Sequence, residues 1–113
     1  MSKRSEKTII FDILLNLNSI LEFTDAMDFD KFMKDLKTQY AADRSFEIIG
    51  EATRQLPEQF ILDHPEIEWQ KMIAFRNILI HEYFRVERKI QWNIIQNILP
   101  TLKPKLENLL KDI

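Results

Sequence analysis

Residues 5–23, SEKTIIFDILLNLNSILEF, indicate the fold class of this chain of 113 residues. Large aliphatic residues recur in this stretch at intervals of three and four, which is the spacing of one face of an α-helix. The same spacing returns in residues 41–56, 69–80 and 90–99. Such stretches form amphipathic helices that bury their apolar faces against one another. The sequence therefore predicts an all-α protein.

Capping residues and prolines predict where the helices begin and end. The expected helices cover residues 5–23, 28–36 (capped by Asp28 or Asp30), 39–56 (ended by Pro57), 65–81 and 86–99. Pro100 and Pro104 are expected to stand before a separate C-terminal turn of helix. The predicted fold is an antiparallel bundle of four to five helices that forms a single domain over residues 1–113.

The composition is that of an ordinary globular protein. Hydrophobic residues make up 45% of the chain, and its single glycine leaves little material for the tight turns of a β-protein. The absence of cysteine excludes disulfides, thiol nucleophiles and thiolate metal sites. No run reaches the roughly 18 apolar residues of a membrane span, and the polar start does not resemble a signal peptide. We expect a cytoplasmic protein without a membrane anchor.

Charge is unevenly distributed along the chain. Residues 1–75 hold nine basic and fourteen acidic residues, a balance of -5, whereas residues 76–113 hold seven and four, a balance of +3. A local positive field attracts phosphates even when the total charge is negative. The C-terminal part of the chain is therefore the part that favours an anionic ligand.

That basic part begins with residues 76–83, RNILIHEY, which bring four chemically useful side chains together. With about 100° of rotation per helical residue, Asn77 and His81 share one face, and Arg76 and Tyr83 share a neighbouring face. The four groups can then line one cleft. Histidine is the side chain whose ordinary pKa lies nearest neutrality, so His81 is the candidate for proton transfer.

Arg76 falls on the core-facing side of the predicted helix, where a guanidinium requires a partner or an anion. Glu47 and Glu51, on the preceding long helix, are candidate partners. The alternative is that His81 and Tyr83 form a helix-end cluster with satisfied hydrogen bonds and no chemistry. The spacing alone leaves both interpretations open.

The catalytic interpretation matches the needs of metal-free RNA cleavage. This reaction requires a base, an acid and a cation for the phosphorane charge. His81 can act as base or acid, and Arg76 can hold the phosphate with two hydrogen bonds. One chain offers half of the acid–base pair, so a twofold homodimer with the motif at its axis would complete the site. His64 and His81 lack metal-ligand spacing, and we expect neither a metal nor a cofactor.

Two blocks of sequence together resemble a known family. Residues 44–52, RSFEIIGEA, and residues 76–84, RNILIHEYF, occur in order, with HPEIEW at 64–69 between them and Trp92 after them. This combination resembles the HepT-like branch of the HEPN superfamily over nearly the whole chain. The second block carries the superfamily signature, an arginine and a histidine separated by four residues, with the tyrosine of this branch two residues further on.

The resemblance implies an all-helical dimer in which two motifs meet in a cleft. Active relatives are metal-independent ribonucleases, the toxins of type VII toxin–antitoxin pairs, and their RNA substrate is tRNA or mRNA. Their antitoxin is a small nucleotidyltransferase of the MntA type, which transfers AMP to the motif tyrosine and forms a larger hetero-oligomer with the toxin. By position, Arg76 and His81 would be catalytic and Tyr83 would receive AMP. The supporting residues would be Asn77, Arg44, Glu47 and Glu51.

Several alternatives remain open at this stage. Arg44, Glu47 and Glu51 either orient Arg76 or hold the helices in register as a polar network. The chain could also be a catalytically silent HEPN module that binds a nucleotide or its partner nucleotidyltransferase, or a structural helical dimer. Gly50 lies inside a predicted helix, where glycine costs about 1 kcal/mol relative to alanine, so we expect another helix to approach closely there.

Overall fold

The computed structural model describes residues 4–113, and the regular elements in that range are all helical. They are α1 (Glu6–Phe23), α2 (Phe29–Lys34), α3 (Leu36–Arg54), α4 (Glu58–Asp63), α5 (Trp69–His81), the 3-10 turn η1 (Tyr83–Arg85), α6 (Arg88–Asn93), the π-helical turn η2 (Ile94–Ile98) and α7 (Leu99–Asp112). The predicted all-α class is confirmed. The short helix α2 was among those expected, whereas α4 and the full-length α7 raise the number of helices within residues 4–113 above the predicted four to five.

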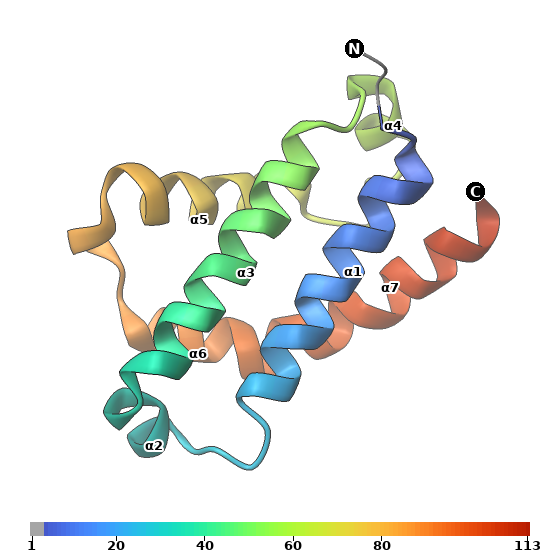
Figure 1. The fold of residues 1–113 in the computed structure, drawn as a ribbon. Coiled ribbons are helices and arrows are strands. Elements are labelled where there is room, and N and C mark those ends of the chain that lie inside the picture. Colours follow the sequence, from blue (N-terminus) through green and yellow to red (C-terminus); the bar gives the residue numbers. More distant parts are fainter. Residues whose placement is uncertain (1–3) are drawn as a thin grey trace.

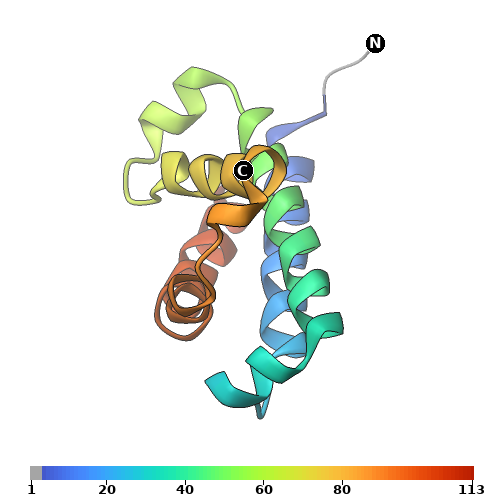
Figure 2. The ribbon, with the colours of Figure 1, turned by 90° about the vertical axis from the view of Figure 1, so that its left-hand side faces the viewer.

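The central element of the fold is α3, which packs against both α1 and α5. Figure 1 shows α1 and α3 side by side and antiparallel, with α5 crossing α3 and with α6 and α7 returning along the bundle. In Figure 2, α1 and α3 form one layer, and α5 and the α6–α7 segment lie on the other side. The segment that holds the motif therefore rests on α3. None of the helices within residues 4–113 is long and apolar enough to cross a membrane.

The core forms where α1, α3 and α7 meet. Ile10, Ile13, Leu17 and Ile20 of α1 are completely buried, as the three- and four-residue spacing predicts. Burial of each such side chain contributes roughly 1.5–3 kcal/mol to stability. The first helix begins at Glu6 because the Ser5 hydroxyl accepts a hydrogen bond from the Thr8 N–H at 3.1 Å. The predicted bounds and core face of this helix are confirmed.

The third helix begins earlier than predicted, at Leu36 instead of about residue 39. Asp35 caps it by accepting the Thr38 N–H at 3.0 Å, and this bond lowers the pKa of the Asp35 carboxyl. Gln39, the expected first residue of this helix, lies in its first turn. Its side chain is buried, and its amide nitrogen donates to the Phe32 carbonyl at 2.8 Å. This bond ties α2 to α3, and Asp28 caps α2 as one of the two predicted alternatives.

The buried surface of α3 is also wider than the predicted stripe. Ala41 and Ile48 belong to the three- and four-residue repeat of residues 41–56, which predicts them in the core, but they are only half-buried, whereas Ala42 and Phe46 are fully buried. The reason is that α3 lies between α1 and α5, so two neighbouring stripes of this helix are covered. A helix with two packed neighbours has no single apolar face to read from sequence.

The prolines near the C-terminus do not interrupt the last helix, contrary to expectation. Pro100 is the second residue of α7, and Pro104 lies inside it. A proline ring in a helix crowds the carbonyl four residues earlier and donates no N–H. The π-helical turn η2 ends at Ile98, two residues before Pro100, and its wider turn accommodates this change in the hydrogen-bond ladder. The Thr101 hydroxyl bonds the Ile98 carbonyl at 2.8 Å.

Helix α5 approaches α3 closely at Gly50, as the sequence predicted. A Cβ atom built on Gly50 would lie 2.2 Å from Cβ of Arg76 and 2.8 Å from the carbonyl oxygen of Met72. These distances are shorter than any packed side chain tolerates, so only glycine fits unless the helices move apart. The crossing places the residues that follow Gly50 directly beside Arg76.

Replacing Gly50 by alanine should therefore destabilise the protein. An alanine in an exposed helix would stabilise by about 1 kcal/mol through helix propensity, whereas here the added methyl group should cost about 1–3 kcal/mol through overpacking. Urea unfolding of Gly50→Ala and the unmodified chain measures the difference. The sign of the change in the free energy of unfolding decides the question, since a stabilised variant would contradict a close crossing at this position.

Candidate active site

The motif helix α5 ends within the motif itself. Its last residue is His81, and the Glu82 N–H closes the helix by bonding the Ile78 carbonyl at 2.9 Å. Tyr83 then begins the 3-10 turn η1. The expectation that Arg76 and Tyr83 share a face of one continuous helix is therefore wrong, because the chain changes direction between them.

Arg76 lies in the crossing of α3 and α5 with its guanidinium mostly buried; 13% of its side chain is exposed. Its Nη2 forms an ion pair with Oε2 of Glu51 at 2.9 Å, and its Nη1 donates to Oδ1 of Asn77 at 2.8 Å. Within the described part of the chain, its Nε is buried and has no hydrogen-bond partner. Of the two candidate glutamates, Glu51 is therefore the one that pairs with Arg76. One N–H on each terminal nitrogen remains for an anion.

The other predicted supporting residues, Arg44 and Glu47, form no hydrogen bond or ion pair with Arg76. Arg44 and Glu47 form an ion pair with each other at 3.8 Å, one to two turns before Glu51 on α3, and Arg44 is 71% exposed. Glu51 also accepts from Arg54 at 3.3 Å. The structure therefore brings Glu51 and Asn77 to the arginine of the motif and leaves Arg44 and Glu47 paired with each other.

His81 is exposed at the C-terminal end of α5. Among residues 4–113 no hydrogen bond or ion pair engages its imidazole, so both ring nitrogens are open to a ligand. The other histidine has a structural setting. His64 packs on the Phe60 ring at 4.6 Å between ring centroids, and its carbonyl accepts from Trp69, as a loop residue would.

The position of Tyr83 depends on a buried polar network that the sequence did not reveal. Arg88, at the start of α6, forms two hydrogen bonds with the carboxylate of Asp43, at 2.6 and 3.0 Å, and donates to the Tyr83 hydroxyl at 2.9 Å. Gln91 accepts from Arg88 at 2.6 Å and donates to Asp43 at 2.7 Å. The network joins α3, η1 and α6.

Asp43 gives no local sequence signal of its burial. It stands among the buried positions of α3, beside Ala42 and three residues before Phe46, and is only 5% exposed. A carboxylate on a buried helix face requires a cation, and Arg88 supplies it. Burial would lower the pKa of Arg88, but the Asp43 carboxylate and the Tyr83 hydroxyl outweigh burial and raise this pKa. The arginine therefore stays charged.

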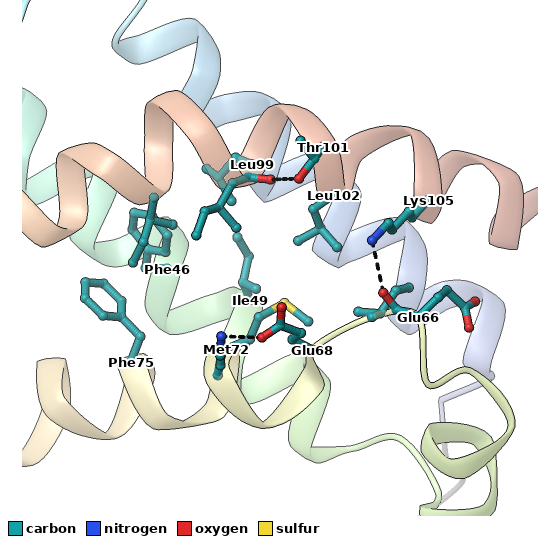
Figure 3. Close-up of a pocket in the computed structure, with 14 residues that line it drawn as sticks. Phe46, Ile49, Glu66, Glu68, Met72, Phe75, Leu99, Thr101, Leu102 and Lys105 are labelled. Carbon is teal, nitrogen blue, oxygen red and sulfur yellow. Dashed lines mark hydrogen bonds and ion pairs between the residues drawn. The ribbon is translucent and has the colours of Figure 1, made fainter.

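An apolar pocket beside the first half of α5 lies apart from these residues. It has a volume of about 150 Å³ and opens between the first half of α5, α3 and the start of α7. Figure 3 shows Phe46, Phe75 and Leu99 around it, with Lys105 and Glu66 at the rim. None of the motif residues lines it, so the cavity is not part of the candidate site. The described residues also include no group of three or more acidic or histidine side chains placed to hold a metal ion.

Loss of the carboxylate partner should destabilise the protein more at Arg88 than at Arg76. Asp43→Asn leaves the buried Arg88 without its counter-charge and should cost about 3–5 kcal/mol. Glu51→Gln removes a partner that is 48% exposed, so its loss should cost less, about 1–2 kcal/mol, even though the Arg76 side chain is mostly buried. Urea unfolding of the two variants measures both. Equal losses would contradict the assignment of Asp43, rather than Glu51, as the structural carboxylate.

Comparison with known proteins finds matches over nearly the whole chain. A family model described as Ribonuclease HepT-like matches residues 13–109. A protein of Thermococcus cleftensis named "Probable ribonuclease HepT" is 43% identical over 109 residues, which cover 96% of this chain and 99% of the relative. A Methanocaldococcus jannaschii protein named "Putative RNase MJ0127" is 43% identical over 113 residues, covering all of this chain and 93% of the relative. No solved structure matches significantly. The chain belongs to the HepT-like ribonuclease family.

Proposed function

We propose that this chain is a metal-independent ribonuclease that acts as the toxin of a toxin–antitoxin pair. The observation that carries the proposal is the arrangement of α5, which presents the exposed imidazole of His81 five residues after a guanidinium that Glu51 and Asn77 hold in place. Membership of the HepT-like ribonuclease family supports it. The substrate would be tRNA or mRNA.

In this proposal His81 and Arg76 divide the chemistry of RNA cleavage. His81 takes the proton from a 2′-hydroxyl, or gives one to the leaving 5′-oxygen. Arg76 donates its remaining N–H groups to the phosphate and stabilises the charge that develops on the phosphorane. Glu51 and Asn77 act by fixing the guanidinium, so that little reorganisation is needed when the charge develops.

Replacing His81 by alanine should abolish both RNA cleavage and the growth arrest caused by expression. A positioned general acid or base contributes about 10²–10⁴-fold to rate, so cleavage of purified tRNA or of a synthetic mRNA should fall by at least that factor. His64→Ala is the matched control, because His64 is the other histidine and lies outside the motif. Unchanged growth arrest in His81→Ala would favour a silent module that binds a nucleotide or a partner protein.

The proposal includes a homodimer with the motif at the subunit interface. One chain supplies one histidine of the motif, whereas acid–base cleavage uses two proton-transfer groups. Apolar side chains around the motif turn are exposed and could be covered by a second copy: Ile80 at 42%, Phe84 at 85% and Ile90 at 53%. Exposed apolar patches mark interaction surfaces in many proteins.

Phe84→Glu should convert this dimer to a monomer and remove the ribonuclease activity, because a charged carboxylate would replace an apolar ring that the second copy covers. Light scattering after size exclusion measures the mass in solution. Phe11→Glu is a control, since Phe11 is 54% exposed on α1, away from the motif. A monomeric wild-type chain that still cleaves RNA would contradict the dimer.

Tyr83 would be the point of control. An antitoxin of the nucleotidyltransferase class would transfer AMP from ATP to its hydroxyl and form a hetero-oligomer with the toxin. Tyr83 is 46% exposed and lies two residues after His81, so its hydroxyl is accessible. AMP adds a bulky anion next to the proposed cleavage site, where it would compete with the substrate phosphate.

Incubation with ATP and an MntA-type nucleotidyltransferase should add the mass of AMP to the chain and stop RNA cleavage. Tyr83→Phe should gain no AMP and remain active in the presence of the antitoxin. Tyr40→Phe, which removes the other tyrosine, should behave as the unmodified chain does. Intact mass spectrometry reads the adduct, and an adduct that persists in Tyr83→Phe would contradict this assignment.

A further inference from the structure

The hydrogen bond between Arg88 and Tyr83 has a fixed direction. A guanidinium has only donors, so the phenolic oxygen must accept from Nη2 of Arg88. The O–H proton of Tyr83 must then point away from Arg88. Because the side chain is 46% exposed, that proton points to where solvent or a bound molecule can accept it.

Arg88 itself has little freedom to move. Its Nη1 is used by Asp43 and Gln91, and its Nη2 is used by Asp43 and Tyr83. The four hydrogens on these nitrogens are all committed, and only 12% of the side chain is exposed. The terminal nitrogens of Arg88 therefore have no donor left for a substrate phosphate. Its geometry serves to hold other groups, in contrast to Arg76, whose terminal nitrogens retain donors.

A network of this kind is poorly explained by stability alone. A buried ion pair gains little over apolar packing of the same volume, because removal of its charges from water offsets their attraction. If the ion pair of Arg88 and Asp43 serves to orient Tyr83, this explains why Arg88 also bonds the hydroxyl of that half-exposed side chain. It connects the rigid helix α3 to the turn that follows His81.

We propose that Arg88, held by Asp43 and Gln91, is the positioning residue for the hydroxyl of Tyr83. It holds the oxygen in one place and directs the O–H proton outward. The inference rests on the proposed function in one respect, since it takes Tyr83 as the acceptor of AMP. In that transfer the phenolic oxygen forms a bond to the α-phosphorus of ATP, the bond to pyrophosphate breaks, and the outward proton passes to a base of the transferase.

Acetylation by N-acetylimidazole tests the positioned hydroxyl without any partner protein. The phenolic oxygen bonds the acetyl carbon, the bond from that carbon to imidazole breaks, and the phenolic proton goes to the imidazole. Tyr40 is an internal reference because it is more exposed than Tyr83, at 55% against 46%. We expect Tyr83 to react faster despite its lower exposure, because the Arg88 donor stabilises charge that develops on the oxygen. A rate equal to or below that of Tyr40 would overturn the proposal.

The variant Arg88→Lys separates position from charge. Lysine keeps the positive charge but cannot bond Asp43 and Tyr83 with one planar fork. We expect the ratio of Tyr83 to Tyr40 acetylation to fall by about two- to tenfold, the effect of one ordinary hydrogen bond. Arg85→Lys is the matched control, because Arg85 is in the same turn as Tyr83 but is 61% exposed and pairs with Glu82. An unchanged ratio in folded Arg88→Lys would overturn the proposal, and the wild-type comparison decides it if that variant does not fold.

Transfer of AMP then tests the use of this position. With an MntA-type nucleotidyltransferase and ATP, Arg88→Lys should gain AMP more slowly than the unmodified chain by a similar factor, and Arg85→Lys should not. A rate unchanged in Arg88→Lys would overturn the role in transfer. Absence of any adduct on the unmodified chain would instead defeat the proposed control by AMP, while the acetylation ratio would still decide the positioning of the hydroxyl.

Discussion

The crossing of α3 and α5 at Gly50 is the constraint on which the candidate site depends. Glycine lets the two backbones approach so closely that Glu51, the next residue, reaches Arg76 at 2.9 Å. A side chain at this position would push the helices apart and lengthen that contact. The same contact therefore packs the fold and holds the guanidinium in place.

The second half of the site rests on the same helix. Asp43 precedes Gly50 by seven residues, about two helical turns, so both lie on one side of α3. Gly50 admits Arg76, while Asp43 holds Arg88, which in turn holds Tyr83. One rigid helix thus sets the positions of groups on both sides of His81. Sites supported by regular elements are more precise than sites carried by loops alone.

Local patterns were sufficient where the determining interactions are local. The apolar repeat predicted α1 within one residue at its start, and the segment that holds Arg76 and His81 was identified because both lie in one short stretch. The prediction failed where packing against two neighbours widened the buried face of α3. It failed also at Pro100, because a π-helical turn before a proline leaves no distinctive sequence pattern.

The sequence by itself determined the helical class, the motif that places the chain in its family, and the single glycine at which two helices can touch. Only the tertiary structure decided that Glu51, and not Glu47, holds Arg76, and that Asp43 controls the position of Tyr83 through Arg88. The physical reason is separation along the chain. Asp43 and Arg88 are 45 residues apart, and a buried carboxylate cannot be distinguished from an exposed one until the helices that enclose it are packed together.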